Sequence, residues 1–178
     1  MKKVLIVVDM LNDFVHEKGA LSFKFARFIV PFIKERIEAH IADNNIIIFL
    51  CDAHDGNDKE FERFPKHAVK KTWGAGIIKE LADAVAGYYS LVTISKTRYS
   101  GFYGTNLGTQ LADLAPDEVE VVGVATSICV SDTVGGLANR DYNVIVPIKG
   151  VADFDTIAHI NALERMEKLY GAKIIEPY

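Results

Sequence analysis

The chain has 178 residues, of which 49% are hydrophobic and 25% are charged, and its formal net charge at neutral pH is −4. This composition is typical of a soluble globular protein, and the length predicts one domain that spans residues 1–178. Because the charge balance is slightly acidic and no Lys/Arg run occurs, we expect no nucleic acid or membrane partner. No apolar stretch is long enough to cross a bilayer, and the two cysteines imply no disulfide framework, so we expect a cytoplasmic location.

Short apolar segments rich in Val and Ile alternate with helical patterns along the chain. In chain order, the predicted strands are residues 4–8, 46–50, 91–94, 119–124, 144–148 and 173–175, and the predicted helices are residues 31–42, 76–85, 106–114, 127–139 and 156–170. The strand segments are continuously apolar, which is typical of parallel strands that are buried on both faces. We therefore predict an α/β fold with three α/β/α layers and a six-stranded, mainly parallel sheet.

Reactive side chains follow the carboxyl ends of four predicted strands, where ligands of open parallel sheets bind. They are Asp9, the pair Asp52 and His54, Lys96, and Cys129 near the start of a predicted helix. Each residue alone has a plainer interpretation: a turn Asp, a solvated Lys or a small buried Cys. Together they indicate acyl transfer, because a helix start and Lys96 can lower the pKa of the Cys129 thiol. Asp9 can accept the thiol proton, and amides of the first helical turn can hold an oxyanion.

A second group of residues indicates a metal site. Asp52 and His54 project to the same side of an extended segment, and His67 lies in the loop that follows. Such a set leaves open positions on a divalent metal for water or substrate. Glu60 and Glu62 lie in the same loop, and either could add a carboxylate ligand. The alternative, that loop histidines are ordinary surface residues, stays open at this point.

Three segments carry a resemblance to a known family: Val7-Val-Asp-Met-Leu-Asn-Asp-Phe14, Ser95-Lys-Thr-Arg-Tyr-Ser-Gly-Phe102 and Gly123-Val-Ala-Thr-Ser-Ile-Cys-Val130. With these segments in this order, the chain resembles the isochorismatase-like cysteine hydrolases, and within them the nicotinamidase (pyrazinamidase) type. The resemblance covers nearly the whole length. It implies that Asp9, Lys96 and Cys129 form a catalytic triad. It also implies a cis peptide bond between Val124 and Ala125, and an oxyanion hole formed by the backbone amides of Ala125 and Cys129.

The resemblance further implies a divalent metal, usually zinc, with manganese or iron as alternatives. The matching ligand positions are Asp52, His54, Glu60 and His67, with Glu62 as the alternative to Glu60. The positions that match the family's ring pocket are Phe14, Phe64 and Tyr99. Because family members commonly form dimers or tetramers, the resemblance also implies a homo-oligomer.

The resulting prediction is a metal-dependent cysteine amidohydrolase: a nicotinamidase of NAD salvage that forms nicotinic acid and ammonia through a thioester on Cys129. Leu11 and Ser127 differ from the residues common in nicotinamidases, which leaves another small amide or a ureido compound open as the substrate. A catalytically silent binding protein of the same fold is a further alternative. Cys129 argues against a true isochorismatase, and the lack of Gly-x-Gly-x-x-Gly after the first strand argues against a dinucleotide-binding domain.

Overall fold

The computed structural model describes residues 1–176 and contains a seven-stranded sheet in the order β3-β2-β1-β4-β5-β7, with β6 paired to β4. All the strand pairs are parallel. The strands are β1 (Lys3–Val8), β2 (Ile46–Asp52), β3 (Leu91–Lys96), β4 (Glu118–Val124), β5 (Val144–Pro147), β6 (Val151–Ala152) and β7 (Lys173–Ile175). Their Val- and Ile-rich sequences suit this position, because β-branched residues pack well in a sheet that is covered on both faces.

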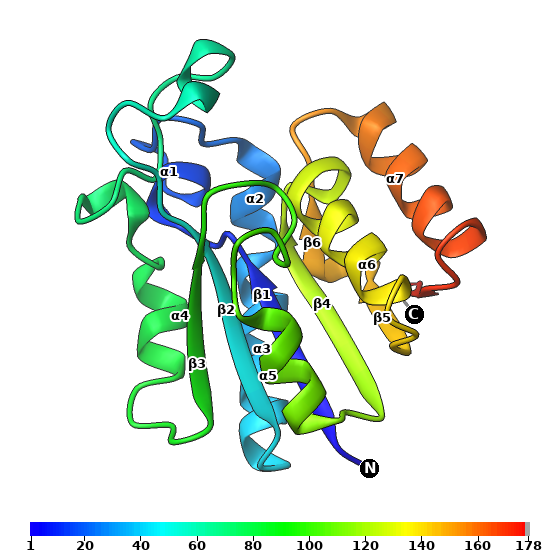
Figure 1. Cartoon of the computed structure of the whole chain (residues 1–178). Coiled ribbons are helices and arrows are strands. Elements are labelled where there is room, and N and C mark those ends of the chain that lie inside the picture. The colour runs from blue at the N-terminus through cyan, green and yellow to red at the C-terminus, as the bar shows by residue number, and fades with distance from the viewer. Residues whose placement is uncertain (177–178) are drawn as a thin grey trace.

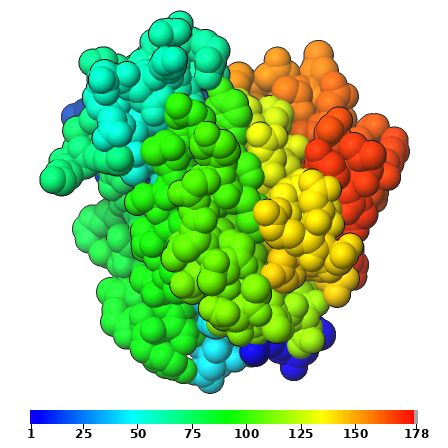
Figure 2. All heavy atoms as spheres, in the orientation of Figure 1, coloured from blue at the N-terminus to red at the C-terminus, as the bar shows by residue number. Residues whose placement is uncertain are grey.

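Helices cover both faces of the sheet (Figure 1). They are α1 (Asn12–Val15), α2 (Lys24–Phe28), α3 (Val30–Ala42), α4 (Lys79–Ala84), α5 (Leu107–Leu114), α6 (Ser131–Ala138) and α7 (Thr156–Lys168). The helices α3 and α4 share one buried cluster with Leu5 and Val7 of β1, and α5, α6 and α7 share another with Val4, Ile6 and Val8. In Figure 2 the atoms of α5 and α6 and their neighbouring loops hide the strands behind them. No helix among residues 1–176 is both long and apolar enough to cross a membrane.

The predicted α/β class and its three layers are confirmed, with local differences. The sheet has seven strands rather than six, because the two residues of β6 are too few to form a recognisable apolar run. The predicted helix 127–139 begins with a π-helical turn, Thr126–Val130, and α6 follows it. The predicted helix 76–85 is shorter, because a 3-10 turn at Trp73–Ala75 and an extended link precede α4. The sequence predicts neither α1 nor α2, since elements of four or five residues show no helical period.

A buried carboxylate, Glu120 on β4, lies beneath α3 and binds two of its side chains. Arg36 donates hydrogen bonds of 2.7 and 2.9 Å to Glu120, and His40 Nε2 lies 3.1 Å from Glu120 Oε2. Burial raises the pKa of Glu120, but the hydrogen bonds from His40 and Arg36 outweigh burial and lower the pKa to about 2. The folded protein therefore binds the ionised form of this carboxylate more favourably than the unfolded chain does.

We expect this group to make the protein less stable in acid. Because its folded pKa of about 2 lies below the ordinary value of 4.5, Glu120 contributes stability above pH 4.5 and loses it as the pH falls towards 2. The full contribution is about 3 kcal/mol, and about 2 kcal/mol of it is lost by about pH 3. Urea unfolding at about pH 6 and about pH 3 should show a smaller pH effect for Glu120→Gln than for the wild type. Glu118→Gln, which removes a partly exposed ion pair with Lys3, is the control and should keep the pH effect of the wild type. A pH effect in Glu120→Gln as large as that of the wild type would contradict the prediction.

Candidate active site

The central strands bring the predicted reactive side chains to one edge of the sheet. Asp9 directly follows β1, and Asp52 and Lys96 end β2 and β3 as partners in register. Cys129 lies in the π-helical turn after β4. Because β3, β2, β1 and β4 are neighbours in the sheet, these four residues lie close together. Gly123 permits the close approach of β4 to β1, since a Cβ atom there would lie 2.0 Å from a carbonyl oxygen of β1.

Lys96 connects the two carboxylates and the thiol. Its Nζ lies 2.7 Å from Asp9 Oδ2, 2.6 Å from Asp52 Oδ1 and 3.4 Å from Cys129 Sγ. The backbone amide of Asp52 donates to Asp9 Oδ1 at 2.8 Å. All four residues are buried, and even Cys129 is only 7% exposed. The structure thus brings the three predicted catalytic residues together and adds Asp52 as a second carboxylate on the ammonium group.

Burial decides the protonation of this group. Burial and the charge of Asp52 raise the pKa of Asp9 to about 6, although Lys96 opposes them. Burial also raises the pKa of Cys129 well above its ordinary value, and Lys96 offsets only part of that effect. Lys96 lowers the pKa of the Cys129 thiol, as the sequence predicts, but burial outweighs Lys96, so the pKa of the thiol in the resting site lies above its ordinary value. The thiol stays protonated in the resting site, and a carboxylate oxygen of Asp9 lies within 4.8 Å of Cys129 Sγ, close enough for Asp9 to take the proton once substrate draws the groups together.

The two backbone amides that the resemblance assigns to oxyanion binding belong to Ala125 and Cys129, and both residues border one cavity. The peptide bond between Val124 and Ala125 is cis, as the resemblance implies. The carbonyl oxygen of Ala125 accepts hydrogen bonds from the amides of Ile128 and Val130, which closes residues 126–130 into a tight turn. This turn holds Cys129 beside the cavity, just before α6 begins.

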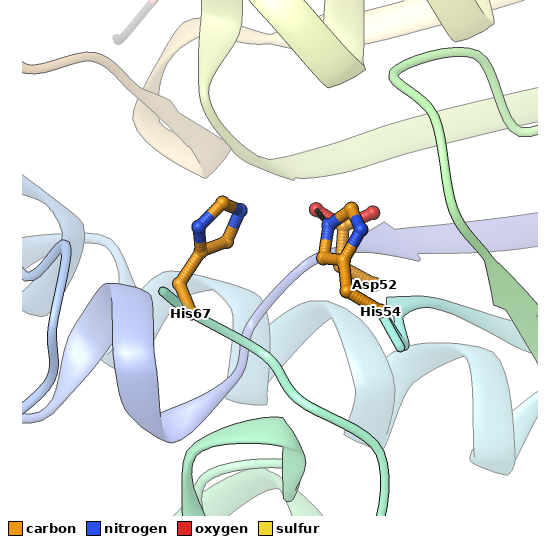
Figure 3. Close-up of side chains that lie close together, drawn as sticks. All are labelled: Asp52, His54 and His67. Carbon is orange, nitrogen blue, oxygen red and sulfur yellow. Dashed lines mark ion pairs between the residues drawn. The ribbon is translucent and has the colours of Figure 1, made fainter. Parts of the chain in front are cut away.

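The candidate metal ligands lie next to the reactive group. Asp52, His54 and His67 offer ligand atoms that all lie within 4.8 Å of one another, and Figure 3 shows the two rings and the carboxylate pointing to the same side. Glu60 joins them, with its Oε1 3.7 Å from His67 Nε2. Because Glu60 is buried and Glu62 is exposed, the structure brings Glu60, and not Glu62, to this place.

The donor atoms at this place fit a divalent cation. His54 Nε2 and Glu60 Oε2 are buried, and neither atom has a hydrogen-bond partner among residues 1–176. Buried polar atoms without partners are rare in proteins, and one metal ion would satisfy both. Imidazole nitrogens together with carboxylate oxygens suit zinc, manganese or iron. The group around Lys96 also offers three ligand atoms within 4.8 Å, but the ammonium already supplies a cation there.

A cavity of about 390 Å³ borders both groups of residues. Phe14, Phe64 and Tyr99, the predicted ring-pocket residues, line it. The rings of Phe14 and Phe64 meet the ring of His67 edge-on, at centroid distances of 5.5 and 6.3 Å. Among the lining residues that the sequence pattern misses are the large apolar side chains of Leu21, Phe23, Ile128 and Phe154. They lie in short or irregular segments, and only the tertiary fold brings them to one wall.

Comparison with known proteins agrees with this arrangement. A family model described as the Isochorismatase domain matches residues 3–176. The chain belongs to the isochorismatase family. The crystal structure of nicotinamidase PncA from Bacillus subtilis is 31% identical to this family member, with a TM-score of 0.93 over 99% of this chain and 100% of that chain.

Two more solved structures resemble this isochorismatase-family protein. Pyrazinamidase of Pyrococcus horikoshii, in complex with zinc, is 30% identical over 99% of this chain and 100% of that chain, with a TM-score of 0.89. N-carbamoylsarcosine amidase from Thermoplasma acidophilum is 30% identical over 99% of this chain and 96% of that chain, with a TM-score of 0.87. Family and relatives together show that this protein is an amidohydrolase, a hydrolase acting on amide bonds.

In this isochorismatase-family protein, Asp13 connects three parts of the cavity wall. Its carboxylate accepts the backbone amide of Ala20 at 3.1 Å and that of Ala68 at 2.8 Å. Ala20 borders the cavity, Ala68 directly follows His67, and Asp13 itself precedes Phe14. The sequence pattern does not reveal this role, because an Asp in a loop or short helix shows nothing of a backbone partner 55 residues away.

We expect Asp13→Ala to lower the free energy of unfolding by about 1–3 kcal/mol, because the buried amide of Ala68 would lose its acceptor. Asp13→Asn, which keeps one acceptor oxygen, should lose less. Urea unfolding measures both changes. Asp83→Ala, which removes an exposed ion pair with Lys79, is the control and should stay within about 0.5 kcal/mol of the wild type. An equally small change for Asp13→Ala would contradict the prediction.

Proposed function

We propose that this amidohydrolase is a nicotinamidase that converts nicotinamide into nicotinic acid and ammonia through a thioester on Cys129. The observation that carries the proposal is that one cavity borders both groups of functional side chains. Asp9 and Cys129 line it, and so do Glu60 and His67. An aromatic amide in this cavity could therefore present its carboxamide to the thiol while its ring nitrogen faces the candidate metal ligands.

The lining of the cavity favours an uncharged aromatic amide over a substrate that carries a carboxylate, such as N-carbamoylsarcosine. Among residues 1–176, no lysine or arginine borders the cavity, so a substrate carboxylate would find no cationic side chain there to pair with. Phe14, Phe64 and Tyr99 offer aromatic surface that suits a flat ring. The nicotinamidase and pyrazinamidase among the relatives support the same choice.

In the proposed reaction, ionised Asp9 accepts the proton of the Cys129 thiol, and Sγ attacks the carboxamide carbon. The charge that develops on the carboxamide oxygen would be held by the amides of Ala125 and Cys129, and one such donor typically contributes about 2.7–4 kcal/mol to lowering the barrier. Although burial opposes it, neighbouring anionic groups hold the pKa of Lys96 well above its ordinary value. Lys96 therefore stays protonated and stabilises the thiolate as it forms.

Release of ammonia and then of the acid requires three further proton transfers, and all three use Asp9. Protonated Asp9 gives its proton to the amide nitrogen, the carbon–nitrogen bond breaks, and ammonia departs from the thioester on Cys129. A water molecule next loses a proton to Asp9 and attacks the thioester carbon. The carbon–sulfur bond breaks, and the sulfur regains a proton from Asp9. A pKa of about 6 suits a group that must accept and return protons near neutral pH.

Asp52, His54, Glu60 and His67 would hold the divalent metal, whose chemistry as a Lewis acid is to bind the ring nitrogen and so orient the ring. The chain's own residues add the remaining constraints. Phe14 and Phe64 contact His67, and together with Tyr99 they leave a slot between aromatic side chains. A ring bound in this slot would direct its carboxamide to Cys129.

The experiment that tests the proposal is the measurement of ammonia released from nicotinamide by purified protein, with zinc or manganese supplied and again after chelation. We expect release that falls on chelation and returns when the metal is restored. N-carbamoylsarcosine is the comparison substrate, and we expect much slower release from it. No release from nicotinamide by protein with confirmed bound metal would overturn the assignment, and faster release from the ureido compound would favour that substrate class instead.

A further inference from the structure

Asp58, to which the proposed reaction gives no role, is hydrogen-bonded to three residues around the candidate metal site. Its Oδ2 lies 3.1 Å from His54 Nδ1, and its Oδ1 accepts the backbone amide of Glu60 at 2.9 Å. Nη1 of Arg98 lies 3.1 Å from Asp58 Oδ1 and 3.0 Å from Oδ2. The Asp58 side chain is only 8% exposed, so solvent competes little for these contacts.

The two candidate ligands that Asp58 contacts both keep a donor atom free for a metal. Because Nδ1 of His54 donates to a carboxylate, the ring carries its proton on Nδ1 and offers the lone pair of Nε2. His54 Nε2 and Glu60 Oε2 are the two buried atoms at this site that lack a hydrogen-bond partner among residues 1–176. One carboxylate therefore orients the imidazole of His54 and fixes the backbone from which Glu60 projects.

Arg98 attaches Asp58 to the strand that carries Lys96. Arg98 follows Lys96 by two residues, and its Nη1 also donates to the carbonyl oxygen of Thr97. The ion pair between Arg98 and Asp58 thus joins the loop of the candidate metal ligands to the end of β3. A movement of this loop would have to break a bridged ion pair and a histidine contact at the same time.

We propose that Asp58 is a positioning residue of the metal site: it holds His54 with Nε2 towards the ion, fixes Glu60 through its backbone amide, and is itself held by Arg98. A carboxylate on the far nitrogen of a ligating histidine fixes the ring orientation and makes the ligating nitrogen more basic. The inference rests on the proposed function in one respect, namely that a divalent metal binds at His54 and Glu60.

The test is the affinity of the metal-free protein for Zn²⁺ and for Mn²⁺, measured by competition with a chelating dye and by titration calorimetry, with no amide present. We expect Asp58→Asn to weaken metal binding by about 10- to 100-fold, because the amide keeps the shape but loses the charge and the ion pair. Asp55→Asn is the matched control. Asp55 lies three residues away, is 70% exposed in its side chain and pairs only with Lys70 among residues 1–176, so its change should stay within about twofold.

Arg98→Lys provides a second variant that leaves the Asp58 side chain in place, and it decides the matter if Asp58→Asn does not fold. Because a lysine ammonium lacks the planar guanidinium whose Nη1 contacts both Asp58 oxygens and the carbonyl oxygen of Thr97, we expect about three- to tenfold weaker metal binding. The visible absorption spectrum of the Co²⁺-loaded protein reports the geometry of the ligands. It should change in Asp58→Asn and stay unchanged in Asp55→Asn, whereas a mere loss of stability would leave the spectrum of the folded protein as it is.

Metal affinity of folded Asp58→Asn within about threefold of the wild type would overturn the proposal. An unchanged Co²⁺ spectrum in that variant, or a wild type that binds none of these ions, would also overturn it. If Asp58→Asn does not fold, metal affinity of Arg98→Lys within about twofold of the wild type overturns it as well. A wild type that binds metal in an Asp58-dependent way but releases no ammonia from nicotinamide would support the positioning role and refute only the substrate assignment.

Discussion

Replacement of Cys129 by alanine should lower ammonia release from nicotinamide by about 10⁴- to 10⁶-fold while the protein stays folded. The thiol is the nucleophile of the proposed reaction, and neither Asp9 nor the amide of Ala125 can form the acyl intermediate in its place. Cys129 is a small, buried residue, and alanine fits the same space with the loss of one atom, so the fold should tolerate the change. Ammonia release and thermal unfolding, measured on the same preparation, check both parts of this expectation.

The chain contains a matched control for this variant in its other cysteine, Cys51. It is buried to the same degree, at 6% exposure against 7% for Cys129, but it packs in the cluster on the α3 and α4 face and does not border the cavity. Burial and the charge of Asp9 raise the pKa of Cys51 to about 12, and because this thiol does not border the cavity, a substrate bound there would not reach it. Cys51→Ala should keep turnover within about threefold of the wild type. Substantial turnover in Cys129→Ala, or its loss in Cys51→Ala, would contradict the covalent mechanism.

Replacement of Lys96 by methionine should destabilise the metal-free protein by about 3–5 kcal/mol and should also remove turnover. The ammonium group lies 2.7 Å from one carboxylate and 2.6 Å from another, and all three groups are buried. Without it, the negative charges of Asp9 and Asp52 would face each other in a site that solvent cannot screen. Lys96 lowers the pKa of Asp9, so its removal raises that pKa further, and the destabilisation should shrink as the pH falls and protonation of Asp9 removes one of the two charges.

Urea unfolding of metal-free Lys96→Met at about pH 7.5 and about pH 5 measures this effect and its pH dependence. Lys70→Met is the control, because Lys70 pairs with Asp55 at a similar distance, 3.0 Å, but on the surface. It should change the free energy of unfolding by no more than about 0.5 kcal/mol at either pH. If the free energy of unfolding of Lys96→Met also changed by no more than about 0.5 kcal/mol, the prediction would be contradicted, because the ammonium group would then contribute little to stabilising the two buried carboxylates.

The strands and the edge of the sheet that carries the site can be predicted from the sequence. Parallel strands that are covered on both faces are rich in apolar residues, and the strand segments before Asp9 and Asp52 are apolar throughout. The edge strand β3 also carries exposed Thr93 and Ser95, and β4 carries Glu120. Parallel pairing then sends every carboxyl end to the same edge, so residues that follow different strands come together whatever their separation along the chain. The family resemblance added the cis bond before Ala125, which the structure contains.

The choice between the two loop glutamates could not be made from the sequence. Glu60 and Glu62 lie two residues apart in one short 3-10 turn, and both are compatible with a ligand role on pattern alone. The backbone amide of Glu60 binds Asp58, and the turn that results buries Glu60 and exposes Glu62. The cavity wall could not be predicted from the sequence for a similar reason. Phe23 and Phe154 belong to segments without helical or strand periodicity, and their rings meet only in the folded chain.

The sequence by itself predicted the sheet apart from β6, the edge that carries the candidate site, and the candidate reactive residues, because apolar runs and residue types are local properties. The tertiary structure alone decided how those residues behave. The protonated state of Cys129, the raised pKa of Asp9 and the lowered pKa of Glu120 all follow from burial and from charges on other elements. The positions of Asp13 and Asp58 as hydrogen-bond centres likewise depend on partners from other segments. Burial and long-range contact are properties of the folded chain, since they exist only once segments distant in sequence have packed together.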